Sequence, residues 1–286
     1  MSNLRELLAV DPSSFRLADT DPAGTPGLPG GKAVRKDPKG WSRGEVETIG
    51  AELTAYQEKL YAAAKTGGSR RRVVLLLQAM DCGGKDGTVR SVLGSMNPTG
   101  IKAVSFGPPD EEERSHDFLW RIERALPLLG FVGVFNRSQY EDVLVVRVHN
   151  IVSEEVWSQR YDQINEWEAR HTADGVTFVK VMLHISPEEQ KERLLARLDD
   201  PTKHWKYNPG DVDERARWND YQEAYQTLLT RCSTPENPWF VVPANRKWYR
   251  NWAVATLLRD AMAAGDPGYP PADFDVTTER ERVLKA

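Results

Sequence analysis

The chain has few of the residues and segments that mark secreted or membrane-bound proteins. Its 286 residues include only two cysteines, Cys82 and Cys232, which cannot form a disulfide framework and lie in no Cys-x-x-Cys pair. No apolar run approaches the roughly 18 residues of a membrane span. The N-terminus has no basic segment followed by a long apolar one, so we expect no secretory signal. These absences predict a cytoplasmic protein without a membrane partner.

An excess of positive charge is also missing, because the formal net charge is −4. A dedicated nucleic-acid binder would carry a basic domain, so we expect no nucleic acid as a partner, although a local basic cleft is compatible with this balance. The composition, 40% hydrophobic and 28% charged, is that of a soluble globular protein. The length suits one large α/β domain or two small ones.

Prolines and glycines are frequent in residues 11–43, where hydrophobic periodicity is weak. We therefore expect residues 1–43 to form an irregular N-terminal arm. A Ser-x-x-Glu capping box at Ser42–Glu45 predicts a helix from there to about Lys65. The body is predicted to span residues 44–264, followed by a C-terminal tail over 265–286.

Short apolar runs then alternate with helical patterns along the body. The runs predict strands at 73–77, 101–106, 131–135, 176–183 and 239–242. The helical patterns lie at 111–126, 153–171, 187–198, 212–231 and 245–263, with a further helix directly after residue 87. This alternation predicts an α/β fold with a mostly parallel five-stranded sheet and helices on both faces.

The first predicted strand leads into AMDCGGKDG, residues 79–87. The stretch resembles the phosphate-binding signature Gly-x4-Gly-Lys-Ser/Thr, with Gly84 and Lys85 in place. Ala79 replaces the first glycine, and Asp86 replaces the final Ser/Thr. A strand, a glycine turn and a helix N-terminus together favour an anion site. The alternative is an ordinary glycine-rich turn with a surface lysine.

Within this loop, Lys85 is expected to reach the bound phosphate as a point charge. Asp81 lies near the place of a metal that bridges phosphates, or else it shapes an Asx turn. The usual hydroxyl ligand to Mg²⁺ is missing, although Thr88 lies nearby. The remaining expected contributors to the phosphate site are Cys82, Gly83, Gly84, Asp86, Gly87 and Thr88.

Polar side chains also follow the third predicted strand, in the sequence NRSQYED. Ligands of open α/β sheets bind at the carboxyl ends of strands, so Asn136, Arg137 and Glu141 should face the same crevice as the loop. Arg137 suits bidentate phosphate contact. Glu141 is a candidate metal ligand or base; alternatively, Glu141 and Asp142 complement a helix dipole.

Four separated stretches together resemble the second polyphosphate kinase family, the polyphosphate:nucleotide phosphotransferases. They are AMDCGGKDG, HDFLWRIERALPLLGFVGVFNRSQYEDVLVVRV, RLDDPTKHWKYNPGD and TPENPWFVVPANRKWYRN. They occur in the family's order, and the likeness extends from about residue 40 to about residue 262.

The resemblance implies a three-layer α/β/α P-loop kinase fold similar to thymidylate kinase, with a helical lid over the site. It implies a homo-oligomer, a dimer or tetramer, and dependence on Mg²⁺, with Mn²⁺ as a substitute. Inorganic polyphosphate and nucleoside mono- or diphosphates are the implied substrates. The catalytic residues would be Asp81, Lys85, Arg137 and Glu141.

The form Asn136-Arg137-Ser138 is similar to the subgroup that phosphorylates both mono- and diphosphates, which makes Asn136 and Arg137 the expected nucleotide contacts. Other members have Asp at the first of these positions. The resemblance therefore assigns metal binding here to Asp81 and Glu141.

The lid is expected at about residues 191–217, a segment rich in lysine and arginine. A polyanionic donor needs several cations along its path, so Arg193, Arg197, Lys203 and Lys206 are the expected lid contacts to phosphates. Their alternative is a solvated helix paired with neighbouring glutamates.

Two other functions compete with a polyphosphate-dependent kinase that phosphorylates ADP or AMP, or the guanine equivalents. The first is an ordinary nucleotide kinase that uses ATP as its phosphoryl donor. The second is a non-catalytic nucleotide-binding switch, which the absence of an Asn-Lys-x-Asp base-reading motif disfavours.

Overall fold

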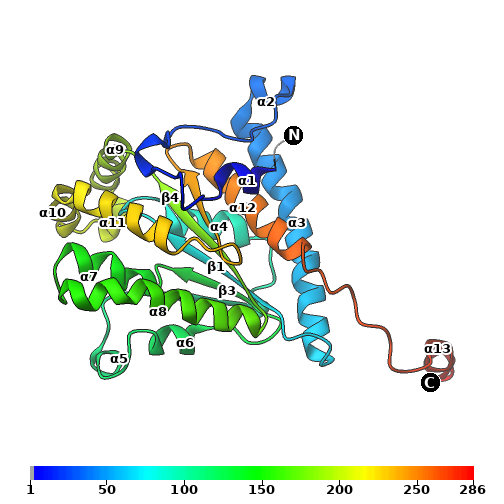
Figure 1. Ribbon diagram of the computed structural model, residues 1–286. Coiled ribbons are helices and arrows are strands. Elements are labelled where there is room, and N and C mark those ends of the chain that lie inside the picture. The colour runs from blue at the N-terminus through cyan, green and yellow to red at the C-terminus, as the bar shows by residue number, and fades with distance from the viewer. Residues whose placement is uncertain (1–2) are drawn as a thin grey trace.

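A parallel five-stranded sheet lies at the centre of the computed structural model, which describes residues 3–286 (Figure 1). The strands run in the order β2-β3-β1-β4-β5. They are β1 (Arg72–Gln78), β2 (Ile101–Ser105), β3 (Val132–Asn136), β4 (Val176–His184) and β5 (Trp239–Pro243). Every pairing is parallel, so all five carboxyl ends meet at one edge. The predicted strands are confirmed to within one residue at each end.

Helices surround this sheet. The α-helices are α1 (Leu4–Leu8), α2 (Lys32–Lys36), α3 (Pro38–Lys65), α4 (Lys85–Leu93), α5 (Glu111–Arg114), α6 (Trp120–Ala125), α7 (Val145–Val148), α8 (Glu154–Ala173), α9 (Pro187–Leu198), α10 (Gly210–Ala216), α11 (Trp218–Arg231), α12 (Lys247–Ala263) and α13 (Val276–Lys285). Short 3₁₀ helices are η1 (Leu17–Asp19), η2 (Pro98–Gly100), η3 (Gln139–Val143) and η4 (Pro201–Lys206).

The core has two halves, one on each face of the sheet. Alternate residues of β1 divide between them, with Leu75 on one side and Leu76 on the other. The first half packs α1, α3, α4 and α12 against the sheet, and the second packs α6, α7, α8 and α11. The predicted three-layer α/β/α fold is therefore confirmed.

The first long helix begins earlier than the capping box indicated. Helix α3 starts at Pro38, and Asp37 caps it by accepting from the backbone N–H of Gly40. An Asp-Pro pair supplies a cap and a pre-set first turn, which is a stronger start than Ser42 offers. Ser42 is instead buried, and its hydroxyl donates to the carbonyl of Trp248 at 2.7 Å.

Two predicted helices are interrupted, and the short helices α1, α2 and α7 and the tail helix α13 lie outside the predicted helical ranges. The expected helix at 111–126 is broken into α5 and α6, since residues 115–119 form turns. The helix expected at 212–231 begins at Gly210 and breaks at Arg217, between α10 and α11. The tail contains α13, whose residues are almost all exposed and which lies away from the body (Figure 1).

The N-terminal segment is fastened to the body at several points. The backbone N–H of Val10 donates to Trp239 on β5 at 2.9 Å, and Leu8 joins the core. The segment also accepts a hydrogen bond from Tyr249 through the carbonyl of Pro26. These contacts hold the N-terminal segment against the start of β5 and the start of α12.

No helix within residues 3–286 is long and apolar enough to cross a membrane.

Candidate active site

The phosphate loop connects β1 to α4 and has two residues in the left-handed region. Cys82 has φ 62° and Gly84 has φ 98°. Gly84 precedes the first residue of α4, and a side chain there would collide with the guanidinium of Arg250. The loop therefore needs glycine at this position for two reasons, its backbone conformation and the approach of Arg250. Thr88 is buried, and its hydroxyl donates to the carbonyl of Gly84 at 3.1 Å, which closes the turn.

Lys85 is the first residue of α4 and bends back over the loop. Its Nζ donates to the carbonyl of Ala79 at 3.1 Å. Burial lowers the pKa of Lys85, and the nearby Arg137 lowers it further. A lysine held in this way is a compact cation that points at the place where the glycine turn would receive a phosphate.

Arg137 joins the loop to the end of β3. Its Nη2 donates to Asp81 Oδ1 at 3.1 Å, and its Nη1 lies 3.7 Å from Glu141 Oε2. Arg137 follows Asn136, which pairs with Leu77 in the β1–β3 ladder. The backbone N–H of Arg137 donates to the Leu77 carbonyl at 3.0 Å. The sheet therefore brings the two acids predicted from the sequence together around one guanidinium.

The environment of Glu141 is unusual for an acid. Burial raises its pKa, although Arg137 and Lys85 act in the opposite direction. With its amide nitrogen turned towards Glu141, Gln78 donates to Oε1 at 3.0 Å and accepts from Ser138. Asp142 points elsewhere, since its carboxylate accepts from Arg160 at 2.9 Å. Of the two neighbouring acids, only Glu141 faces the loop.

Asp86 connects the loop to the lid. Its Oδ1 accepts from Asn136 Nδ2 at 2.9 Å, and its Oδ2 lies 3.7 Å from Lys206 Nζ. Asn136 therefore contacts an acid of the loop, on the side that faces η4. Lys206 also lies 4.9 Å over the ring of Trp205.

The lid arginines are tied to the protein by hydrogen bonds. Arg193 on α9 donates to the carbonyls of Cys82 at 2.8 Å and Ala244 at 2.6 Å, and pairs with Glu189. Arg197 donates to the carbonyl of Lys206 at 3.0 Å and contacts Asp211. Both side chains therefore hold loops in place, Arg193 the phosphate loop and Arg197 the lid. Lys203 is exposed and pairs with Asp200.

Arg250 is a buried cation on α12. It is 3% exposed, donates to Asn251 Oδ1 at 2.8 Å, and has no acidic partner within residues 3–286. Burial, with a contribution from Arg193, lowers the pKa of Arg250 to about 10. The guanidinium lies against Gly84 and Gly87 of the loop. Buried charges are normally paired, so this one indicates an anion site.

These side chains surround a cleft of about 680 Å³, which we call the basic cleft. Nine lysines and arginines line it against two carboxylates, Asp81 and Asp86. The cations are Lys85, Arg90, Arg137, Arg193, Arg197, Lys203, Lys206, Lys247 and Arg250. Such an excess suits a ligand with many negative charges.

A second cavity of about 340 Å³ adjoins the first, and we call it the acidic cavity. Asp81 and Arg137 line both spaces. Glu141, Asp211 and Glu214 are further acids of its lining, beside two tyrosines, Tyr221 and Tyr225. The two cavities therefore meet at the pair formed by Asp81 and Arg137.

The family profile for "Polyphosphate kinase 2 (PPK2)" matches residues 40–268. The chain belongs to the polyphosphate kinase 2 family. It is 43% identical to the AMP/ADP-polyphosphate phosphotransferase of Meiothermus ruber over 94% of this chain and 95% of the relative. It is 41% identical to the ADP-polyphosphate phosphotransferase of Rhodopseudomonas palustris, over 81% of each chain.

A solved structure supports the same family assignment. The crystal structure of polyphosphate kinase 2 from Arthrobacter aurescens superposes with a TM-score of 0.93 and 49% sequence identity. The match covers 100% of this chain and 98% of the other. The family resemblance found in the four sequence stretches is therefore confirmed, and so is the fold that it implied.

Proposed function

We propose that the protein transfers the terminal phosphoryl group of inorganic polyphosphate to ADP and AMP, reversibly. The observation that carries this proposal is the basic cleft, where nine cations surround a phosphate loop. A nucleoside triphosphate has only three phosphates and needs few cations. A polyphosphate chain carries about one negative charge per phosphate along its whole length, so it suits a cleft with many cations. The names of the relatives from Meiothermus and Rhodopseudomonas agree with such a donor.

The two cavities give the donor and the acceptor separate places. The polyphosphate chain lies in the basic cleft, with its last phosphate against Lys85 and the loop amides. The nucleotide enters the acidic cavity, with its terminal phosphate at Arg137 and its sugar and base towards Tyr221 and Tyr225. Phosphoryl transfer depends mainly on positioning and charge neutralisation, which this junction supplies. The acceptor phosphate is already anionic near neutral pH, so no strong base is required.

Asp81 and Glu141 fit a magnesium site completed by substrate phosphates. Both carboxylates lie within 4 Å of the same guanidinium, so their oxygens face one small volume. Residues 3–286 hold no group of three or more acids, histidines or cysteines that could bind a metal alone. Mg²⁺ commonly binds through one or two carboxylates together with phosphates, which agrees with this set. When bound, the ion neutralises charge on the phosphates.

Replacing Asp81 tests this metal assignment. In Asp81→Asn, the amide keeps one oxygen but loses the charge, so we expect the Mg²⁺ concentration for half-maximal rate to rise about tenfold. The measurement is the initial rate against free Mg²⁺. Asp86→Asn is the matched control, because Asp86 faces Asn136 and Lys206 instead. An equal shift in both variants, or none in Asp81→Asn, would remove Asp81 from the metal site.

The lid provides a second test, through Arg197. Arg197→Ala removes the bond to the Lys206 carbonyl and loosens the segment that carries Lys203 and Lys206. We expect KM for polyphosphate to rise about tenfold and KM for ADP to change less than about twofold. Lys191→Ala, on the same helix but outside the cleft, is the control. Parallel rises in both KM values would indicate a general folding defect.

The acceptors can be tested directly. Purified protein is mixed with long-chain polyphosphate, Mg²⁺ and either AMP, ADP, GMP or GDP, and the nucleotides are separated by chromatography. We expect ADP from AMP and ATP from ADP, with guanine nucleotides as additional acceptors. Phosphorylation of AMP by ATP, with no product from polyphosphate, would instead favour the ordinary nucleotide kinase. Tight nucleotide binding without turnover would favour the non-catalytic switch.

We also infer a homo-oligomer, a dimer or tetramer, in the cytoplasm. Nucleotide acceptors and Mg²⁺ are intracellular, and both cysteines are free thiols. Light scattering coupled to size-exclusion chromatography tests the oligomer, and a monomer at micromolar concentration would contradict it.

A further inference from the structure

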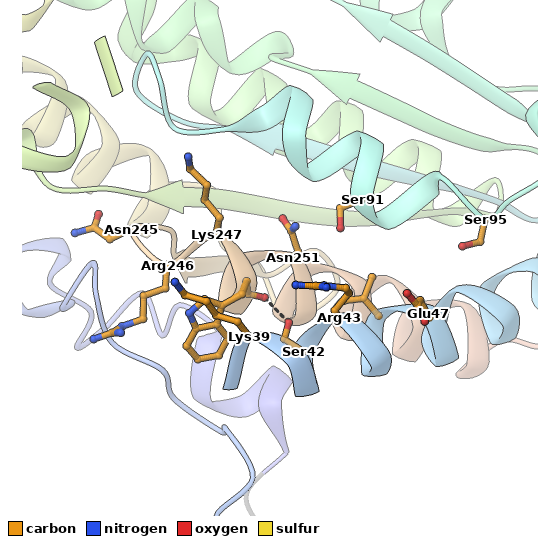
Figure 2. Close-up of a pocket in the computed structure, with 12 residues that line it drawn as sticks. Lys39, Ser42, Arg43, Glu47, Ser91, Ser95, Asn245, Arg246, Lys247 and Asn251 are labelled. Atoms are coloured by element: carbon orange, nitrogen blue, oxygen red, sulfur yellow. Dashed lines mark hydrogen bonds between the residues drawn. The ribbon is translucent and has the colours of Figure 1, made fainter. Parts of the chain in front are cut away.

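A third cavity, of about 740 Å³, lies between the N-terminal part of α3, the helix α4 and the start of α12. Figure 2 shows Lys39 and Arg43 of α3 near the side chains that begin α12, with Ser91 of α4 across from them. We call this space the flanking cavity. The hydrogen bond from Ser42 to the Trp248 carbonyl holds its two principal helices together.

The lining of the flanking cavity carries unbalanced positive charge. Lys39, Arg43, Arg246 and Lys247 face it, against a single acid, Glu47. None of these four cations forms an ion pair within residues 3–286. Arg246 donates only to a backbone carbonyl, that of Ala23, at 2.8 Å. Four unpaired cations around one hollow favour an anionic ligand.

The N-terminus of α12 adds to this positive field. The helix has 17 residues, and Arg246 at its cap position makes no side-chain capping bond. The first N–H groups of such a helix attract anions. The serine hydroxyls of Ser91 and Ser95 and the amide of Asn251 supply further donors around the same space.

The flanking cavity borders the basic cleft at Lys247, which lines both. Burial lowers the pKa of Lys247. Arg193 and Arg250 lower it further, while Glu189 acts in the opposite direction. Lys247 therefore offers an extended anion a contact that the two spaces share.

We propose that the flanking cavity binds distal phosphates of a long polyphosphate donor and so makes the protein favour long chains over short ones. The proposal rests on the proposed function, because the donor must occupy the basic cleft. Lys39 and Arg43 contact phosphates that lie beyond Lys247, remote from the group in transit. Short donors such as tripolyphosphate fill the basic cleft alone.

The test compares the wild type with a double variant, Lys39→Gln with Arg43→Gln. Both side chains are exposed, so folding should be unaffected. We expect KM and Kd for long-chain polyphosphate to rise about tenfold, and the values for tripolyphosphate to change less than about twofold. Calorimetric titration measures Kd independently of turnover. The control is Arg280→Gln with Lys285→Gln on α13, which removes the same charge away from the cavity.

Three outcomes would overturn the proposal. The double variant could leave long-chain binding unchanged, or weaken tripolyphosphate as much as the long chain. Alternatively, the wild type could bind two tripolyphosphate ions, one of which is lost in the double variant, which would indicate a separate site for a free phosphate compound. Failure of the wild type to make ATP from any polyphosphate would contradict the proposed function instead, and the binding comparison would still report on the cavity.

Discussion

Lys85→Ala is expected to lower kcat at least about a thousandfold, the loss typical when a preorganised charge at the reacting centre is removed. The lysine bends over the loop, and in the proposed mechanism it contacts the phosphoryl group in transit. Two neighbouring cations are engaged elsewhere, Arg137 by Asp81 and Arg193 by backbone carbonyls, so neither can take the position of Lys85 without moving. The measurement is the rate of ATP formation from ADP and polyphosphate at saturating substrates.

The variant should remain folded. Burial lowers the pKa of Lys85, so its charge does not favour the folded state. Circular dichroism and thermal unfolding check this directly. Lys85→Arg is a second variant, in which a planar guanidinium replaces the compact ammonium, and we expect only partial recovery of the rate. Normal turnover by a folded Lys85→Ala protein would remove Lys85 from the catalytic group.

Arg250→Met has the next largest expected effect, a rise of roughly fiftyfold in KM for polyphosphate. The guanidinium is 3% exposed and lies against Gly84, without an acid to neutralise it. A charged hydrogen bond to phosphate in such a dry position contributes more than one at the surface. KM for ADP should change much less, since Arg250 does not line the acidic cavity.

In the absence of substrates, the same substitution should raise the thermal stability of the protein. Burial lowers the pKa of Arg250 to about 10. Below that pH the guanidinium is charged in the folded state, where it is less well solvated than in the unfolded chain. The depression corresponds to a cost of about 3 kcal/mol at neutral pH, which falls only as the pH rises through the folded pKa. Partly offset by the lost bond to Asn251, this predicts a rise in Tm of roughly 2–5 °C in Arg250→Met.

Arg259→Met provides the matched control on the same helix. Arg259 pairs with Glu52 at 2.9 Å and lies outside the basic cleft. Its replacement should therefore leave KM for polyphosphate unchanged and should not raise the Tm. Added polyphosphate should protect wild type against heat more than Arg250→Met. A lower Tm with an unchanged KM would show that Arg250 only supports the loop.

Local patterns predicted several of the side chains that the structure brings together at the carboxyl edge of the sheet. The strand, glycine turn and lysine at residues 73–85 predict a phosphate site from one contiguous stretch, and the structure confirms the strand and the helix on either side of the turn. Asn136 and Arg137 could be placed beside it because carboxyl ends of parallel strands meet at one edge, and the β1–β3 pairing confirms that arrangement. Their roles in nucleotide and metal binding stay predictions.

Other features depend on packing that no local pattern shows. Arg250 lies in an apolar stretch, RNWAVATLL, and only the approach of α12 to α4 directs it at Gly84. The signal in the sequence was the basic run of Arg246, Lys247 and Arg250, which does not show which of the three is buried. Arg193 was predicted to contact phosphates from its charge and its place in the expected lid, and its bonds to two backbone carbonyls could not be foreseen. Its contact with phosphates stays a prediction.

The most direct test of the central claim follows the phosphoryl group itself by ³¹P nuclear magnetic resonance. Wild-type protein is incubated with ADP, Mg²⁺ and long-chain polyphosphate, with ADP alone and Lys85→Ala as controls. We predict that ATP appears as phosphate units leave the chain, one for one, and that neither control forms it at a comparable rate. ATP formed equally well from ADP alone, or no ATP formed by folded wild-type protein, would contradict the account.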